Sequence, residues 1–156
     1  MKKIYFNGRF LTKSVTGIQR FSREIILALD NFWAEEKVNV DATILVPQGA
    51  SALGPLRVIK TRTIGSLQGH LWEQIELWRA SRDGFLVNLA ACGPLFKRDQ
   101  ITVIHDAAVY RKPENFSFLY VSWHRILGVF LSRFSRIATV SEFSKSELTA
   151  LLRILS

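Results

Sequence analysis

Thr102-Val-Ile-His-Asp-Ala-Ala-Val-Tyr-Arg-Lys-Pro-Glu114 is the stretch of this chain that decides its fold. The β-branched run from Ile101 to Ile104 predicts a buried strand, and His105 and Asp106 follow it directly. A proline-containing loop comes next. In an open α/β sheet, ligands bind where the strands stop and the loops begin. The stretch therefore predicts an α/β protein with a binding site at the carboxyl edge of its sheet.

Apolar runs and helical patterns alternate on either side of this stretch. The run 85–89, apolar except for Asn88, predicts another strand that is covered on both faces. Further strands are predicted at 3–6, 38–46, 56–60 and 136–140, and helices at 18–32, 69–79, 115–131 and from 141 through Leu155. The alternation predicts one α/β domain over residues 1–156, with an open, mostly parallel sheet and helices on both faces.

The charge balance of the chain is strongly basic. Lys and Arg number 21 against 13 Asp and Glu, which gives a formal net charge of +8. Such a balance predicts a polyanionic neighbour: nucleic acid, an anionic membrane surface or a phosphorylated substrate. The basic residues are scattered over many segments, however, so a solvated basic surface explains them equally well.

Cysteine use and hydropathy bear on the compartment. Cys92 is the single cysteine, and its small neighbours predict a buried apolar role for it. The chain has neither a signal-peptide pattern nor the run of about 20 apolar residues that a membrane-spanning helix needs. These features favour a reducing, cytoplasmic compartment.

Two further strand ends carry candidate site residues. Thr16 and Gly17 lie between the first strand and the first helix, behind the polar loop 9–15. Free amides at a helix start attract phosphate, and glycine permits close approach, although a plain turn also accounts for this glycine. Ser141 and Glu142 follow the last strand and have the pattern of a helix cap and an acidic first turn. Their position after a strand also puts them at the ligand edge.

The histidines are predicted to differ in role. His105, after the central strand, is suited to donating to a sugar hydroxyl or to proton transfer, and a structural hydrogen bond to the backbone is the competing explanation. His70 and His124 fall in helical segments and are predicted to be surface or packing residues. No triplet of His, Cys and carboxylate has the sequence spacing of metal ligands, so no metal site is predicted.

The helix predicted at 69–79 carries two more expectations. Its apolar residues are expected to build core, and its carboxylates are expected to be solvated charges. The apolar set is Leu71, Trp72, Ile75 and Trp78, and the carboxylates are Glu73 and Glu76.

Several segments, in a fixed order along the chain, carry a family resemblance. They are Asn7-Gly-Arg9, Thr16-Gly-Ile-Gln-Arg-Phe21, His70-Leu-Trp-Glu-Gln74, Val103-Ile-His-Asp106, Lys112-Pro-Glu114 and Ile137-Ala-Thr-Val-Ser-Glu-Phe-Ser-Lys145. In these the chain resembles the amino-terminal half of the family-four retaining glycosyltransferases, a mannosyltransferase-like group with two Rossmann-like domains. One departure is that the family's usual pair of glycines at the first loop is Thr16-Gly17 here.

The resemblance implies a role for each candidate residue. Residues 1–156 would be the acceptor-side, Rossmann-like half of the two-domain B-type fold. The loop with Thr16 and Gly17 would approach the donor pyrophosphate or the transferring sugar, and His105 would be the catalytic residue beside the reacting sugar. Substrate binding is implied for Asp106 as well, and Ser141 and Glu142 would close the wall of the cleft.

The resemblance also implies substrates and partners. A nucleotide-sugar donor and a glycan or lipid-linked acceptor, as in polysaccharide biosynthesis, would be the substrates, with no cofactor besides. The family's second domain holds most of the donor site, so we expect these residues alone to be a truncated, inactive half. Peripheral contact with an anionic inner membrane face is expected, and so is self-association through uncovered apolar surface.

Two other functions remain open from the sequence. One is a basic nucleic-acid-binding α/β module, which is disfavoured because no helix concentrates Lys and Arg and no binding motif is present. The other is a non-catalytic remnant that folds without acting. We therefore expect no nucleic-acid partner.

Overall fold

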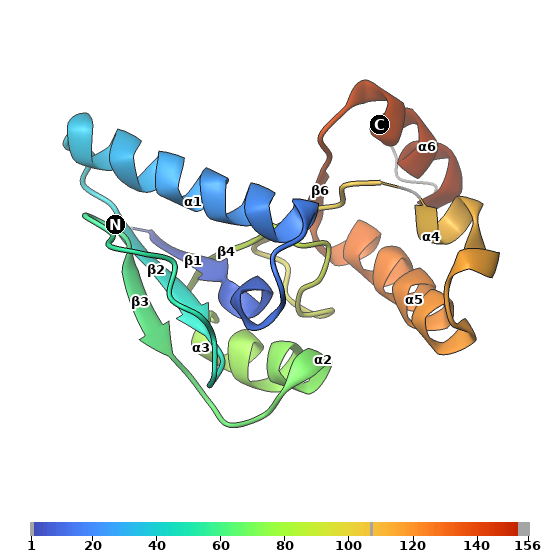
Figure 1. Cartoon of the computed structure of the whole chain (residues 1–156), viewed down its shortest axis with the longest axis horizontal. Helices are drawn as coiled ribbons and strands as arrows, with labels where there is room; N and C mark the ends of the chain where they lie inside the picture. Colours follow the sequence, from blue (N-terminus) through green and yellow to red (C-terminus); the bar gives the residue numbers. More distant parts are fainter. Residues whose placement is uncertain (1, 107, 153–156) are drawn as a thin grey trace.

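The fold is an open, parallel α/β sheet with helices on both faces. The computed structural model describes residues 2–106 and 108–152. Within these residues six strands form one sheet in the order β3-β2-β1-β4-β5-β6, and all neighbouring pairs are parallel (Figure 1). The strands are β1 (Lys3–Asn7), β2 (Asp41–Val46), β3 (Lys60–Thr63), β4 (Gly84–Asn88), β5 (Gln100–Val103) and β6 (Arg136–Ala138). This confirms the predicted Rossmann-like fold class.

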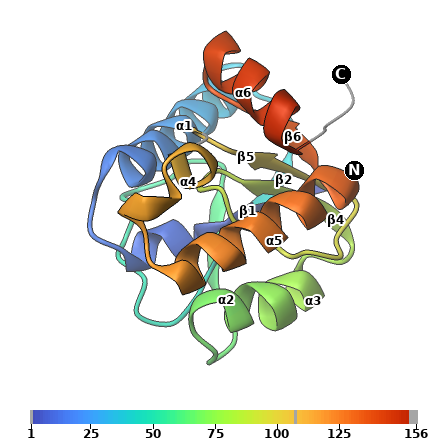
Figure 2. The same cartoon turned by 90° about the vertical axis from the view of Figure 1, so that its right-hand side faces the viewer.

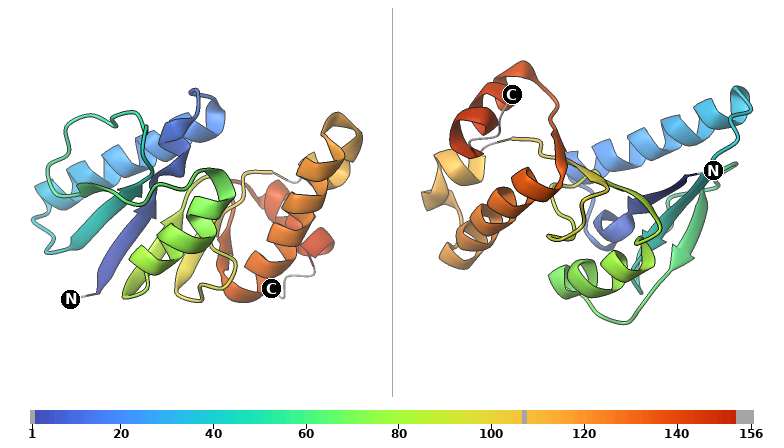
Figure 3. Two further views of the ribbon diagram at one scale, coloured as in Figure 1. Left: turned by 90° about the horizontal axis from the view of Figure 1, so that it is seen from below. Right: turned by 180° about the vertical axis from the view of Figure 1, so that it is seen from behind.

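The helices cover the sheet in two layers. The long helix α1 (Gly17–Glu35) and the last helix, α6 (Glu142–Leu152), lie on one side. The helical segment α2 (Gly69–Leu71), η2 (Trp72–Leu77) and α3 (Trp78–Ala80) lies on the other, as does α5 (Phe118–Phe134) (Figures 1 and 2). Seen from below, α2 to α3 runs across the sheet face opposite α1 (Figure 3).

Side-chain alternation along the strands builds a core on each face. Phe6 and Ile44 belong to the cluster with Ile26 of α1, whereas their neighbours Tyr5 and Leu45 pack with Trp72 and Leu77 on the opposite face. Successive residues of a strand point to opposite sides, so the apolar runs of β1 and β2 serve both layers.

Asp30 explains why the strand predicted at 56–60 is wrong. The Asp30 carboxylate on α1 is buried and accepts hydrogen bonds from the amides of Arg57, Val58 and Ile59, at 2.7, 2.9 and 2.7 Å. Burial disfavours the charged form, but the three amides outweigh it and lower the pKa of Asp30. Because these amides bond to the helix, the strand begins only at Lys60. The second strand likewise begins at Asp41 and not at Val38.

The helix 69–80 buries a different side from the one predicted. Residues 72–77 form a π-helical stretch, whose wider turn puts Trp72, Glu73 and Leu77 inside. Trp72 is fully buried, as expected, and its indole donates to the Ile64 carbonyl at 2.9 Å. The prediction that Leu71, Ile75 and Trp78 are core residues was wrong. The prediction that Glu73 is a solvated charge was also wrong. Exposed fractions are 62% for Leu71, 43% for Ile75, 37% for Trp78 and 0% for Glu73.

Several boundaries also differ from the sequence pattern. The loop predicted at 9–15 contains a 3-10 helix, η1 (Gly8–Thr12), with Phe10 and Leu11 buried. The loop predicted after Asp106 contains two short helices, α4 (Ala108–Arg111) and η3 (Pro113–Asn115), and the helix predicted at 115–131 is present as α5, shifted to Phe118–Phe134. Ser117 then caps α5 by accepting from the Tyr120 amide at 3.3 Å. Leu155, expected in the last helix, lies outside the described residues. Among those residues, we find no helix with the length and apolarity to span a bilayer.

Gly8 offers a test of how closely β1 and β2 approach at the site edge. A Cβ at this position would lie 2.7 Å from the Leu45 carbonyl oxygen and 2.5 Å from Val46 Cγ1. Since backbone cannot yield as a flexible side chain does, we expect Gly8→Ala to lower the free energy of unfolding by about 1–3 kcal/mol in urea denaturation. Gly17→Ala is the matched control, because a Cβ there meets nothing within 4 Å. Equal stability of the two variants would contradict this packing.

Candidate functional site

Two adjoining cavities lie at the carboxyl edge of the sheet. The first, the His105 cavity, has a volume of about 210 Å³ and contains His105, Asp106, Tyr110 and Phe116 in its lining. The second, the switch-point cavity, has about 120 Å³ and opens over the ends of β1 and β4. They share the lining residues Ile18, Ala91, Tyr120 and His124. The two cavities are therefore neighbours at the strand ends.

The position of the switch-point cavity follows from the strand order. From β1 the chain builds outward to β2 and β3, then returns to place β4 on the other side of β1. Connections leave β1 and β4 toward opposite faces of the sheet, so a crevice opens between them. Ligands of open α/β sheets bind at this switch point, outside the carboxyl ends of the strands.

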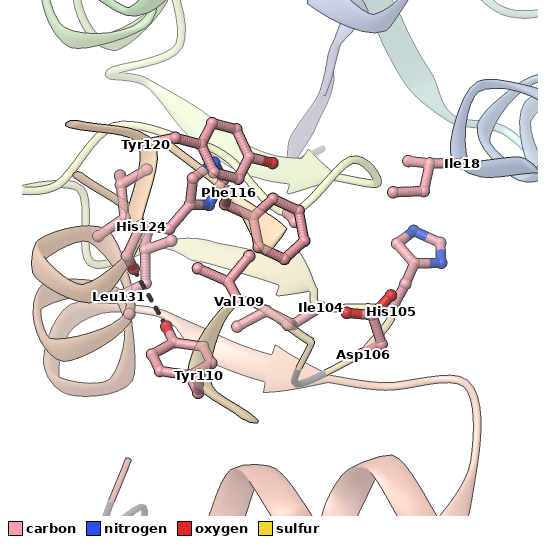
Figure 4. A pocket seen from close by; sticks show the side chains of 13 residues that line it. Ile18, Ile104, His105, Asp106, Val109, Tyr110, Phe116, Tyr120, His124 and Leu131 are labelled. Carbon is pink, nitrogen blue, oxygen red and sulfur yellow. Dashed lines mark hydrogen bonds between the residues drawn. The ribbon is translucent and has the colours of Figure 1, made fainter. Parts of the chain in front are cut away.

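His105 is held in a defined orientation at the rim of its cavity. Its Nε2 lies 2.8 Å from the Leu89 carbonyl oxygen, and its ring makes an edge contact with Phe21 at 4.8 Å between centroids. Because a carbonyl only accepts, Nε2 carries the proton of this bond, and in the neutral form of the ring Nδ1 is left as an acceptor. His105 and Ile18 face Tyr120 and Phe116 across the cavity (Figure 4). The backbone bond thus leaves a basic nitrogen for chemistry.

The other predicted site residues lie at the same edge but differ in what they contact. Asp106 lines the His105 cavity. Thr16 caps α1, with its amide donating to Gln19 Oε1 at 3.2 Å, and Gly17 begins the helix whose next residue lines both cavities. Thr16 and Gly17 themselves line neither cavity.

Neither Ser141 nor Glu142 lines a cavity. Ser141 Oγ accepts from the Ser144 amide at 3.1 Å, so Ser141 caps α6 as expected. Ser144 Oγ in turn donates to the His105 carbonyl at 3.1 Å, which ties α6 to the loop after β5. The Glu142 side chain is 91% exposed and pairs with Lys145 at 3.6 Å, and it lines neither cavity.

A buried carboxylate, which the sequence pattern misplaced, lines the switch-point cavity. Glu73 Oε1 accepts from Asn7 Nδ2 at 2.9 Å and lies 3.0 Å from Arg9 Nε, while Oε2 lies 3.0 Å from His70 Nδ1. The three partners come from β1, η1 and α2. A charge this deeply buried persists only when it is paired and hydrogen-bonded.

Polar side chains at the strand ends extend this cluster into the sheet. Asn7 Nδ2 also lies 3.1 Å from Asn88 Oδ1 and 3.1 Å from the Cys92 carbonyl oxygen. Asn88 Nδ2 donates to Gln100 Oε1 at 2.9 Å and to Thr102 Oγ1 at 3.2 Å. Asparagine at the ends of two apolar strands, β1 and β4, is the sequence signal that could have revealed this network.

His124, predicted to be a surface or packing residue, faces both cavities from α5. Its ring lies 4.1 Å from the Tyr120 ring, and Tyr110 donates to its backbone carbonyl at 3.1 Å (Figure 4). Burial, followed by the nearby His70, Lys13 and Arg9, lowers the pKa of His124 to about 4. His124 is therefore neutral near pH 7, in surroundings of positive charge.

The structure brings together a metal-ligand triplet that sequence spacing did not reveal. The ligand atoms of His70, Glu73 and Cys92 all lie within 4.8 Å of one another. Two features make this group poor for a cation. Arg9 already neutralises Glu73, and burial raises the pKa of the Cys92 thiol to about 12, which keeps it protonated.

Comparisons of the chain with known protein families, with curated proteins and with solved structures found no match. What the protein does must therefore be inferred from its fold and from the geometry of this edge.

Glu73→Gln tests the buried carboxylate. The amide can still accept from Asn7 but leaves the Arg9 guanidinium and the His70 ring without their charged partner. Breaking a buried ion pair from one side costs about 3–5 kcal/mol, and we expect a loss near the lower end because Arg9 retains some contact with water. Urea denaturation measures it. Glu24→Gln, an exposed change on α1, is the control. A loss no larger than that of the control would show that the cluster does not hold the fold.

The lowered pKa of His124 predicts that the stability of the fold depends on pH in a specific way. The unfolded chain binds a proton at the ordinary pKa of 6.5, whereas the folded chain binds it only near 4. The free energy of unfolding should therefore fall as the pH drops from about 6.5 to 4. Allowing for partial exposure, wild type should lose about 1 kcal/mol more than His124→Gln across this window. Parallel curves for the two proteins in urea denaturation would contradict the buried, neutral state.

Proposed function

We propose that this domain is the acceptor-side domain of a retaining glycosyltransferase that moves a sugar from a nucleotide sugar to a glycan or lipid-linked acceptor. The observation that carries the proposal is convergence. Four of the segments in which the chain resembles that family surround the two cavities, although they are far apart in sequence. They contribute Asn7 and Arg9, Ile18 and Gln19, His70 and Glu73, and His105 and Asp106.

The state of His105 supports a role beside the reacting sugar. With Nε2–H engaged by the Leu89 carbonyl, Nδ1 can accept a hydrogen bond from a sugar hydroxyl or take up a proton. Donation from Nδ1 would require a protonated ring. We therefore assign His105 the task of orienting a hydroxyl group, with the backbone bond keeping the ring in position.

Gly17 supports close approach of a ligand to the start of α1. A Cβ there would meet nothing within 4 Å, so packing within the described structure does not require glycine. The free protein has room for a side chain at this position. A ligand bound against the backbone would fill that room and would explain why the residue is glycine. The donor diphosphate is the group that the family resemblance would place there.

The outer side of α5 supports peripheral contact with an anionic membrane face. Phe118 and Leu119 are 83% and 80% exposed, and Ile126 and Val129 lie farther along the helix, 47% and 46% exposed. The exposed residues Arg125 and Arg133 are on the same helix. Apolar side chains beside basic ones suit the boundary between acyl chains and anionic headgroups. An acceptor carried on a lipid would then be presented near the cavities.

The proposal predicts the behaviour of His105→Ala. We expect the gene product that carries this domain to release nucleoside diphosphate from one of a panel of nucleotide sugars. His105→Ala should lower kcat about 100-fold, because a positioning and proton-accepting group is lost. Coupled detection of the released nucleoside diphosphate measures the rate. Unchanged urea denaturation would show that the fold is intact.

Two comparisons make this test decisive. Glu24→Gln, on the exposed side of α1, should leave the rate unchanged. Gly17→Ala should raise KM for the donor while the fold stays stable, because the added methyl occupies open space at the ligand edge. Absence of turnover with every donor would refute the proposed function. A His105→Ala rate equal to that of wild type would refute the role of His105.

A further inference from the structure

A basic groove lies apart from the two cavities, toward the amino ends of β1, β2 and β3. Two hollows of about 360 and 610 Å³ form it, and they share Lys3, Tyr5 and Arg62 in their linings. Of the described residues that line them, none also lines the His105 cavity or the switch-point cavity. We call this surface the β3 groove, and its cations are Lys3, Lys60, Arg62, Arg79 and Arg82.

Positive charge dominates the β3 groove. Five cations against two carboxylates in its lining leave a net charge of +3. Each carboxylate takes one lysine: Lys3 Nζ lies 2.5 Å from Asp83, and Lys60 Nζ lies 3.9 Å from Asp41. Among the described residues, the three arginines of the groove have no carboxylate within ion-pair distance. The groove therefore favours an anionic occupant.

The strand register aims the cations of β3 into this groove. Arg62 pairs with Leu45, and Leu45 packs beside Trp72 on the side of the sheet that carries α2 to α3. Side chains two residues apart on a strand point to the same face, so Lys60 shares this side with Arg62. Every second residue of β3 thus presents a cation to the groove.

The backbone of β3 is open along its outer edge. Among the described strands, β3 stands last in the sheet order and pairs with β2 alone (Figure 1). The Ile64 amide donates inward to the Val46 carbonyl at 2.9 Å, so the N–H and C=O groups of Thr61 and Thr63 point outward. All four residues of β3 are exposed. Such an edge can pair with another extended polypeptide chain.

We propose that β3 and its groove bind an extended acidic segment of a partner protein, which adds to the sheet as a further strand. Main-chain hydrogen bonds to Thr61 and Thr63 hold the segment, and its alternate Asp or Glu side chains meet Lys60 and Arg62. The same cations repel a second copy of this edge, so pairing is selective for an acidic chain.

The cations of α3 and of the turn after it strengthen this choice of occupant. Charges on β3 alone would serve to keep the edge unpaired. Arg79 and Arg82, however, extend the positive surface from β3 across the groove. The unpaired backbone edge selects a polypeptide, and the charge selects an acidic one. This surface is separate from the proposed transferase site, so binding there is measured without turnover.

Fluorescence anisotropy with a labelled peptide of alternating glutamate and threonine tests the backbone part of the proposal. We expect Thr61→Pro to weaken peptide binding about tenfold, because proline removes an outward amide and leaves the inward ladder to β2 intact. Thr61→Val keeps that amide and should bind the peptide as wild type does. Urea denaturation of both variants shows whether the fold is unchanged.

Arg62→Gln tests the charge part of the proposal. It should weaken binding of the same peptide about threefold, as loss of one exposed ion pair does, and the difference from wild type should vanish at high salt. Arg20→Gln is the matched control, because it removes the same charge from an exposed position on α1, outside the groove. Its affinity for the peptide should equal that of wild type.

Methylated peptides keep the test sharp even if Thr61→Pro is less stable than wild type. One peptide carries N-methyl groups on its glutamates and the other on its threonines, and the protein is unaltered. Only the peptide whose methylated amides face β3 should lose affinity, since the amides of the other point away.

Several outcomes would overturn strand addition at β3. They are absence of peptide binding, equal affinity of the two methylated peptides, and equal affinity of Arg62→Gln and Arg20→Gln at low salt. Equally tight binding of a single-stranded oligonucleotide of the same charge would also count against it, because the groove would then respond to charge alone.

Discussion

The hydrogen-bonded carboxylate of Glu73 is the interaction on which the functional edge depends. It joins the end of β1, through Asn7, to the turn after it, through Arg9, and to the helix on the far face, through His70. A buried ion pair contributes little net stability compared with apolar packing, but it tolerates few alternative geometries. Its effect is therefore to place three elements at one point. The rim of the switch-point cavity follows from that placement.

The π-helical stretch 72–77 is what allows Glu73 to reach this position. Trp72, Glu73 and Leu77 are all buried. The helix is therefore held against the sheet both by apolar packing and by the buried Glu73 carboxylate. Gln74 on the same stretch accepts from the Leu95 amide at 2.9 Å and donates to the Gly93 carbonyl at 3.1 Å. These bonds hold the loop between β4 and β5, which supplies Ala91 and Cys92 to the cavity wall. An irregular helix and an irregular loop thus stabilise each other.

The two cavities at this edge of the sheet differ in the chemistry of their linings. The His105 cavity is lined mainly by apolar and aromatic side chains, with one imidazole oriented by the backbone. The switch-point cavity is lined by cations, amides and a neutralised carboxylate. Tyr120 and His124 of α5 stand between them, so movement of α5 would change both at once.

The amino-acid sequence by itself determined the layer architecture and the edge at which the candidate site was placed. Strand and helix periodicities are local, and the parallel arrangement follows from the crossovers, so His105 and Asp106 could be placed after β5 from the pattern alone. Only the tertiary structure decided the partners. Asp30 bonds to amides 27 to 29 residues away and thereby ends a predicted strand, and Glu73 meets Asn7 across 66 residues. A carboxylate on a helix has the same local pattern whether it faces water or an arginine, because the difference lies in long-range contacts that no spacing encodes.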